Sequence, residues 1–184
     1  MRPDPRRALR ISRLLSLALR HQPSALALTL DPHGWASVDA TLAGLAAAGL
    51  PTTADELEDL VRSSDKQRFA LSPDGERIRA NQGHSVDIDL ALPAREPPER
   101  LYHGTVVRFL ASILADGLVR GARTHVHLSP DVRTAEIVAS RRSGPQVILE
   151  VRAAELHRAG HVFVRSENGV WLTHAVPPAY LARR

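Results

Sequence analysis

The stretch LYHGT, residues 101–105, begins the second half of this chain, and its short apolar run is followed by a predicted glycine turn. It follows REPPER, residues 95–100, whose charges and prolines are typical of a linker. A glycine lets a ligand approach the backbone, and His103 and Thr105 offer hydrogen bonds to that ligand. The stretch therefore predicts a nucleotide-binding segment at the start of a second lobe.

Strand and helix patterns follow this stretch in mixed order. Short apolar or alternating runs predict strands at 101–103, 125–129, 147–151, 163–164 and 170–172. Helical spacing predicts helices at 106–115 and 131–140. In the first of these helices, Phe109, Leu110 and Ile113 are expected to face inward, and Gly117 ends it. The second half is therefore expected to be a mixed α/β lobe.

The first half has the outline of a winged helix, which is three helices followed by a β-hairpin. The predicted helices span 7–20, 39–48 with Asp39 as its cap, and a third that begins at the capping-box spacing of 53–56. Runs at 68–71 and 77–80 flank the turn SPDG and predict the hairpin. Alternation of apolar and acidic residues predicts a further strand at 86–92. Winged helices often bind nucleic acid, although many serve only as protein contacts.

The composition is that of a globular protein with a basic surface. The chain has 184 residues, 43% of them hydrophobic, no cysteine and a net charge of +4. Its 24 basic residues include a single lysine, Lys66, and arginine matches phosphate geometry, although a GC-rich genome would give the same bias. No apolar run is long enough to span a membrane, and no apolar signal-peptide core follows the basic start, so we expect a cytoplasmic protein, which the absence of cysteine fits. No exposed apolar stripe is expected, and we therefore expect a monomer.

Two groups of basic residues are candidates for binding an anion. Arg20 and His21 end the first predicted helix, where they would offset the helix dipole or bind a phosphate beside a titratable imidazole. Arg77 and Arg79 alternate along a predicted strand and therefore point to one side, either as a solvated face or as a nucleic-acid contact. These residues alone leave both interpretations open.

Several classes of site are disfavoured by missing motifs. His125 and His127 share a strand face that would suit zinc, but neither an HExxH motif nor a carboxylate cluster accompanies them, and we expect no metal. The chain also lacks the G-x-S-x-G, P-loop and G-x-G-x-x-G motifs.

Six motifs, spread from about residue 10 to residue 180, together resemble the NAD-dependent RNA 2′-phosphotransferases of the KptA family. In order they are LRHQP (19–23), KQRF (66–69), RIRANQGHS (77–85), YHGT (102–105), HVHLS (125–129) and RSENGV (165–170). The resemblance implies an α+β fold with a winged-helix, RNA-binding lobe at 1–93, a linker at 94–100 and an ADP-ribosyltransferase-like, NAD-binding lobe at 101–184. NAD is implied as a co-substrate, and the implied RNA is tRNA-like with a splice-junction 2′-phosphate.

The reaction implied by the resemblance has two steps. The RNA 2′-phosphate first attacks the nicotinamide ribose of NAD and expels nicotinamide. The ribose 2″-hydroxyl then attacks that phosphate, giving 2′-OH RNA and ADP-ribose 1″,2″-cyclic phosphate. The family's catalytic Arg-His-Arg-Arg tetrad corresponds to Arg20, His21, Arg68 and Arg142, with Arg141 as the alternative for the fourth member. His21 alone among them exchanges a proton near neutral pH, which assigns it to the second step.

The resemblance also implies two sets of binding residues. The RNA phosphate would be bound by Arg20, Arg68, Arg77, Arg79, Asn81 and Arg142. NAD would be bound by His103, Gly104, Thr105, Gly117, His127 and Ser129.

Two alternative functions remain open at this stage. One is an ADP-ribosyltransferase acting on protein or on terminal phosphates of nucleic acid, or an NAD hydrolase. Protein-modifying members of that class carry a late catalytic glutamate, whereas this chain has Asn168 and Gly169 there, with Glu167 nearby. The other is a nucleic-acid-binding module without catalysis.

Overall fold

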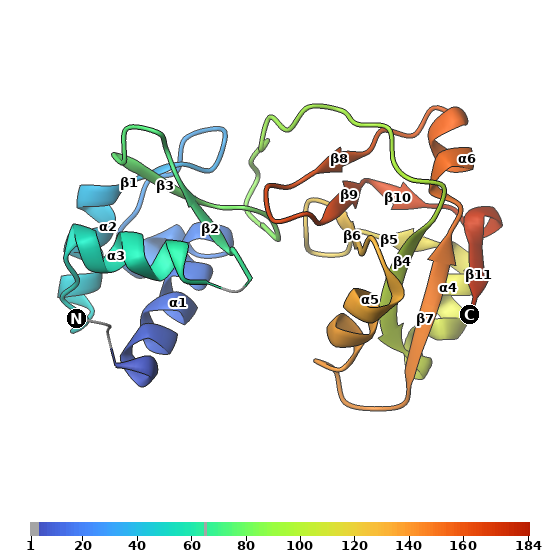
Figure 1. Ribbon diagram of the computed structural model, residues 1–184, viewed down its shortest axis with the longest axis horizontal. Coiled ribbons are helices and arrows are strands. Elements are labelled where there is room, and N and C mark those ends of the chain that lie inside the picture. Colours follow the sequence, from blue (N-terminus) through green and yellow to red (C-terminus); the bar gives the residue numbers. More distant parts are fainter. Residues whose placement is uncertain (1–3, 65) are drawn as a thin grey trace. The chain divides into compact units, whose positions relative to one another are not determined.

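The computed structural model describes residues 4–64 and 66–184 (Figure 1). The chain forms two compact units, Met1–Ala91 and Leu92–Arg184, each with its own hydrophobic core. The first three residues of the predicted lobe 1–93 lie outside the described residues. Both units combine helices with short antiparallel strands, which confirms the α+β class. Within the described ranges, no helix is both long and apolar enough to cross a membrane.

The first unit contains the predicted three α-helices and hairpin. Strands β2 and β3 pair antiparallel, with Phe69 opposite Ala80, and the short β1 pairs with the other edge of β3. In chain order the elements are α1 (Pro5–Arg20), η1 (Pro23–Leu26), β1 (Ala36–Ser37), α2 (Val38–Ala47), α3 (Ala54–Arg62), β2 (Phe69–Leu71) and β3 (Arg77–Ala80).

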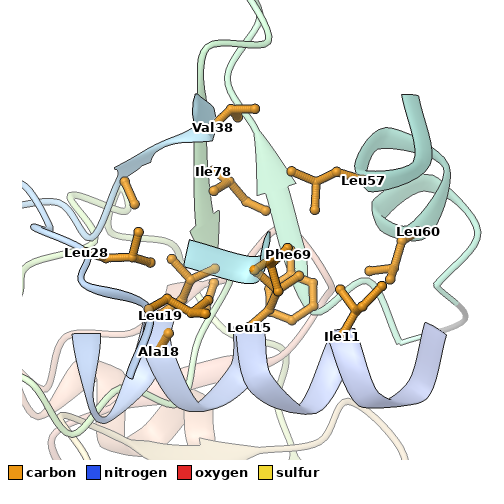
Figure 2. Close-up of a cluster of buried hydrophobic side chains, with 14 of the residues drawn as sticks. Ile11, Leu15, Ala18, Leu19, Leu28, Val38, Leu57, Leu60, Phe69 and Ile78 are labelled. Carbon is orange, nitrogen blue, oxygen red and sulfur yellow. The ribbon is translucent and has the colours of Figure 1, made fainter. Parts of the chain in front are cut away.

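The core of the first unit lies between α1 and the hairpin. Ile11, Leu15 and Leu19 recur at a spacing of four on α1 and are almost fully buried. Figure 2 shows these side chains pointing from α1 toward Phe69 and Ile78 on the hairpin strands. Burying each large apolar side chain contributes about 1.5–3 kcal/mol, so this contact fixes the hairpin against the helix.

The two helix starts predicted from capping residues in this unit have different outcomes. The predicted capping box of α3 is confirmed, since Thr53 Oγ accepts from the Glu56 amide (3.2 Å) and Glu56 Oε2 accepts from the Thr53 amide (3.1 Å). The prediction that Asp39 caps α2 was wrong. Ser37, which is still extended as the end of β1, accepts from the amide of Ala40 at 3.3 Å and begins the helix two residues earlier.

The predicted strand at 86–92 was also wrong. This segment has no strand partner, and two of its amides bond elsewhere: Val86 donates to the carbonyl of Arg20, the last residue of α1, and Asp89 donates to the carbonyl of Pro32. The Asp89 carboxylate then accepts from the amide of Ala91, whose positive φ of 50° turns the chain. The apolar residues of the alternation, Val86, Ile88 and Leu90, are less exposed than the aspartates between them, but the segment that carries them is irregular.

The second unit is built from small antiparallel sheets with helices between their strands (Figure 1). One sheet has the order β11-β7-β4 and another β6-β9-β8, and a bridge between Tyr102 and Ser129 connects β4 to β6. The elements are β4 (Leu101–Val106), η2 (Val107–Phe109), α4 (Leu110–Asp116), β5 (Leu118–Val119), β6 (Val126–Leu128), α5 (Val132–Ala139), β7 (Gln146–Val151), α6 (Ala153–Arg158), β8 (Val164–Arg165), β9 (Trp171–Thr173), β10 (Ala175–Val176), η3 (Pro178–Tyr180) and β11 (Leu181–Arg183).

The glycine turn predicted within 101–105 was wrong, because β4 continues through Gly104 to Val106 and pairs with β7 along its whole length. A Cβ at Gly104 would overlap the carbonyl oxygen of Ala135 and lie 2.7 Å from that carbonyl carbon. Glycine therefore allows the backbone of α5 to lie directly on β4, and the space beside Gly104 Cα holds a helix.

One further expectation for this unit differs from the structure. Phe109 was predicted to face inward, but its side chain is 37% exposed, because a 3₁₀ turn precedes α4 and displaces it from the buried face. In the segment predicted as a linker, Ala94 bridges Val164, and the amide of Arg95 donates to the carbonyl of Phe163 at 2.8 Å.

Candidate functional site

In the first unit, the side chain of Arg20 contacts the main chain of Arg68 at the end of α1. The Arg68 carbonyl accepts from Arg20 Nη2 at 3.3 Å and from the amide of Asn81 at 2.9 Å. The Arg68 guanidinium makes no hydrogen bond or ion pair with the described residues, and it lines a pocket of about 370 Å³ between α1 and the end of α3. A guanidinium beside an open pocket is available to an anion.

His21 follows Arg20 as the C-terminal capping residue of α1, and its ring Nδ1 lies 2.9 Å from Ser85 Oγ. The chain around Ser85 is fixed to the same helix end, because its amide donates to the Arg20 carbonyl at 2.8 Å. Gly83 lies against the Arg20 side chain, whose atoms would be 3.8 Å from a Cβ at that position. The segment 81–85 thus holds Arg20, His21 and Arg68 in one place.

Asn81, predicted to bind the RNA phosphate, has its amide group turned toward the protein. Its Nδ2 donates to the carbonyl of Gln67 at 2.7 Å, and Gln67 has an unusual positive φ of 38°. The Asn81 side chain therefore holds the loop that carries Arg68. Its buried Oδ1 has no hydrogen-bond partner among the described residues.

Arg77 and Arg79 do point to one side of β3, as predicted, and that side is covered by Trp35. Their guanidinium carbons lie 5.5 Å and 4.4 Å from the indole centroid. Arg79 also donates to the Leu90 carbonyl at 3.3 Å, and Arg77 lies 3.9 Å from an Asp31 carboxylate oxygen. Cation–π contacts of this kind stabilise the hairpin and the segment after it.

In the second unit, His103 lies within β4, directly opposite Leu149 of β7. Opposite residues of an antiparallel pair point to the same face, so His103 shares the face of the buried Leu149, and Gly104 faces α5 on the other. His103 Nδ1 lies 3.1 Å from the carbonyl of His127 on β6. Burial lowers the pKa of His103 below its usual value, and the positive charges of Arg142 and Arg123 lower it further.

Arg142 lies in the turn after α5, beside the exposed ring of Phe109. Its guanidinium carbon is 5.4 Å from the ring centroid, and that of Arg108 is 4.9 Å from the same ring. Burial lowers the pKa of Arg123, and Arg142 and then Arg141 add to this effect. The charge of Arg142 lowers the pKa of both His103 and Arg123, whereas the charge of Arg141 contributes at Arg123.

The remaining predicted NAD residues lie in strands or at close contacts. Thr105 is buried in β4, His127 is half-buried in β6, and Ser129 exchanges two main-chain hydrogen bonds with Tyr102. Gly117 ends α4 with φ of 84°, where a Cβ would overlap the carbonyl oxygen of Val176. The need for glycine at position 117 is thus explained by packing.

Two residues near these groups were not predicted from the sequence as site residues. Ser85 stands inside a quoted motif, so its contact with His21 had a sequence signal. Arg123 lies in the turn between β5 and β6, and no pattern marks it. In the described ranges, no group of three or more histidine, aspartate or glutamate side chains is arranged to hold a metal ion.

The geometry defines a two-unit α+β protein with clustered arginines and a histidine suited to phosphate-bearing ligands. The sequence profile of the RNA 2′-phosphotransferase, Tpt1/KptA family matches residues 6–175. A probable RNA 2′-phosphotransferase of Burkholderia lata is 57% identical over 175 residues, covering 95% of this chain and 90% of the relative. Similar relatives with the same description occur in Hahella chejuensis (53% identity, 93% of this chain, 91% of the relative) and Herpetosiphon aurantiacus (52%, 97% and 98%).

This chain belongs to the RNA 2′-phosphotransferase, Tpt1/KptA family, as the resemblance of its motifs predicted.

Proposed function

We propose that this chain transfers an internal RNA 2′-phosphate to NAD, releasing nicotinamide, 2′-OH RNA and ADP-ribose 1″,2″-cyclic phosphate. The observation that carries the proposal is the gathering of Arg20, His21 and Arg68 by the segment 81–85, in a chain whose family match spans 6–175. A tRNA splice junction is the proposed source of the RNA phosphate. A cytoplasmic location and a monomeric state remain predictions.

In the first unit, Arg20 and Arg68 are proposed to bind the RNA 2′-phosphate. Two planar guanidinium groups match a phosphate dianion and offset the charge that grows as it reacts. His21, at the end of the same helix, is proposed to move the proton of the second step, because imidazole titrates near neutral pH. The helix–hairpin order supports a winged-helix assignment of this unit.

In the second unit, the residues around His103 are proposed to bind NAD. NAD carries a pyrophosphate and supplies the ribose carbon to which the phosphate is transferred. The neighbouring charges of Arg142 and Arg123 fit that pyrophosphate, and the burial of His103 keeps its ring neutral, so that it donates or accepts a hydrogen bond without adding charge. Arg142 is proposed as the fourth member of the tetrad. The proposed fold of this unit is ADP-ribosyltransferase-like.

The test is incubation of the full chain with NAD and a short RNA that carries one internal 2′-phosphate, with products separated by mass. Loss of the phosphate with formation of ADP-ribose cyclic phosphate is the expected result. Nicotinamide release without change of the RNA would instead indicate an NAD hydrolase or a protein modifier. ADP-ribose attached to an end of a control RNA with a terminal phosphate would indicate transfer to terminal phosphates, and intact NAD would leave only a binding module.

A further inference from the structure

The 3₁₀ turn η2 contacts the turn after α5 that carries Arg142. The amide of Val107, the first residue of η2, donates to the Pro145 carbonyl at 2.9 Å. Arg108 Nη1 donates to the Ser143 carbonyl at 3.3 Å. The ladder between β4 and β7 ends beside these contacts. Two hydrogen bonds and the end of a strand pair therefore hold the main chain that follows Arg142.

The guanidinium of Arg142 lies over the ring of Phe109, the last residue of η2. Its carbon is 5.4 Å from the ring centroid, within the range of a cation–π interaction. Within residues 4–64 and 66–184, this guanidinium makes neither a hydrogen bond nor an ion pair. Arg141, the preceding residue, has no ring contact in the same ranges. The ring therefore gives Arg142 a neighbour that Arg141 lacks.

Phe109 is held in place although its side chain is 37% exposed. Its carbonyl accepts from Ser112 Oγ at 3.0 Å, and the next residue, Leu110, packs against the core of the second unit. Arg108 lies 4.9 Å from the same ring centroid. The negative faces of the ring attract both cations and offset part of the repulsion between them. Phe109 thus provides a fixed ring for the mobile side chain of Arg142.

We propose that Phe109 is a positioning residue for Arg142, whose guanidinium its ring holds in the orientation that binds the reacting phosphate. The inference rests on the proposed function, in which Arg142 is the fourth member of the tetrad. Binding a phosphate fixes a long arginine side chain and so costs conformational entropy. A ring that limits the conformations beforehand lowers this cost, and a guanidinium already oriented offsets the charge that grows on the phosphate.

The direct test is the set of side-chain proton chemical shifts of Arg142 in spectra of the full chain, assigned by their loss in Arg142→Lys. The ring current of Phe109 is expected to displace these signals in the wild type. Phe109→Leu, which keeps an apolar side chain without a ring, should return them to the shifts of a solvent-exposed arginine. The signals of Arg141, assigned in the same way, should not move. Equal Arg142 shifts in the wild type and in Phe109→Leu would overturn the proposal.

The second test follows single turnovers with NAD and the 2′-phosphorylated RNA, both at saturating concentration. Phe109→Leu is expected to lower the rate of phosphate removal by about two- to fivefold, the effect of losing an exposed cation–π contact. Phe109→Tyr, which keeps the ring, should retain the wild-type rate. An unchanged rate in Phe109→Leu, or the same loss in Phe109→Tyr, would contradict a role of the ring.

Two double variants show whether the effect of Phe109 passes through Arg142. Phe109→Leu added to Arg142→Ala should change the rate by less than about twofold, because the guanidinium that the ring positions is already absent. Phe109→Leu added to Arg141→Ala should still lower the rate by about two- to fivefold. Equal losses in the two backgrounds would mean that Phe109 acts on the fold and not through Arg142.

The control for the spectra and the rates is Leu114→Ala. Leu114 is another exposed apolar residue, in the helix α4 that follows η2, so its loss should change neither the Arg142 signals nor the rate. Urea unfolding of each variant checks that the fold is retained. If the wild type itself leaves the RNA unchanged, the proposed function fails together with the catalytic half of this inference. The spectra decide whether Phe109 orients Arg142 in either case.

Discussion

The two units hold their candidate residues in different ways. In the first unit, Arg20, His21 and Arg68 stand at element ends, and side chain and main chain of the segment 81–85 hold them. In the second unit, His103 and Thr105 lie inside β4, where the ladder with β7 sets their direction. A site at the ends of helices and strands depends on a few individual hydrogen bonds, whereas a site inside a sheet depends on strand register and packing.

This difference also appears in the electrostatics of the two histidines. His21 is exposed at a helix C-terminus beside a hydroxyl, whereas His103 is half-buried, with arginines that lower its pKa further. An exposed imidazole suits proton transfer to a ligand, and a neutral imidazole suits fixed hydrogen bonding. The comparison predicts that variants of His21 change proton transfer, while variants of His103 change folding or NAD binding.

The largest expected effect is that of Arg20→Ala in the first unit. Removing one donor to the reacting phosphate is expected to lower the rate of RNA 2′-phosphate removal by about 10²–10³. NAD binding, measured by titration calorimetry, should remain, because the residues proposed for it all lie in the second unit. Arg13→Ala is the matched control, since Arg13 is an exposed arginine of the same helix. A near-wild-type rate for Arg20→Ala would remove Arg20 from the site.

The next effect separates two adjacent arginines of the second unit. Arg142 lies over Phe109 and acts on the pKa of His103, whereas Arg141 does neither. The single-turnover rate of Arg142→Ala is therefore expected to be at least about tenfold lower than that of Arg141→Ala. A tenfold ratio of rates corresponds to a difference of about 1.4 kcal/mol in transition-state stabilisation. The reverse order of the two rates would make Arg141 the fourth tetrad member.

A pair of glycine variants tests whether each unit depends on its own packing. Gly104→Ala would force the backbone of α5 away from β4 and is expected to destabilise the second unit by about 1–3 kcal/mol. Gly44→Ala, where a Cβ would overlap the Leu26 carbonyl oxygen, should destabilise the first unit by a similar amount. Amide hydrogen exchange should show faster exchange in the altered unit. Unchanged exchange in β4 and β7 of Gly104→Ala would disprove the close helix contact.

The smallest expected effect is a pH dependence of stability due to His103. Because its folded pKa is lowered, the unfolded chain binds a proton first as the pH falls below about 6.5. Stability should therefore be full above that pH and decrease on acidification until the folded pKa is passed, by less than about 1.4 kcal/mol per pH unit. Urea unfolding at pH 8 and pH 5.5 measures the decrease. His103→Gln should show a smaller one, and an equal loss in both proteins would refute the assignment.

The first unit was the more predictable from sequence because its signals are local. Each of these signals acts within a few residues of the chain. They are the capping box at Thr53 and Glu56, the SPDG turn, and the apolar residues Ile11, Leu15 and Leu19, which are four positions apart. The two wrong predictions in the first unit also have local causes. The helix after β1 begins at Ser37 rather than Asp39, and the alternation at 86–92 belongs to a segment without a strand partner.

The sequence by itself determined the family, the α+β class, most helices and the residue types of the candidate site. Those features are set by short-range spacing and by motifs that stay together along the chain. Only the tertiary structure decided that Gly104 lies under α5, that Asn81 holds the loop of Arg68, and that Ser85 reaches His21. These contacts join residues 14 to 64 positions apart, and their existence depends on how the chain packs rather than on any local pattern.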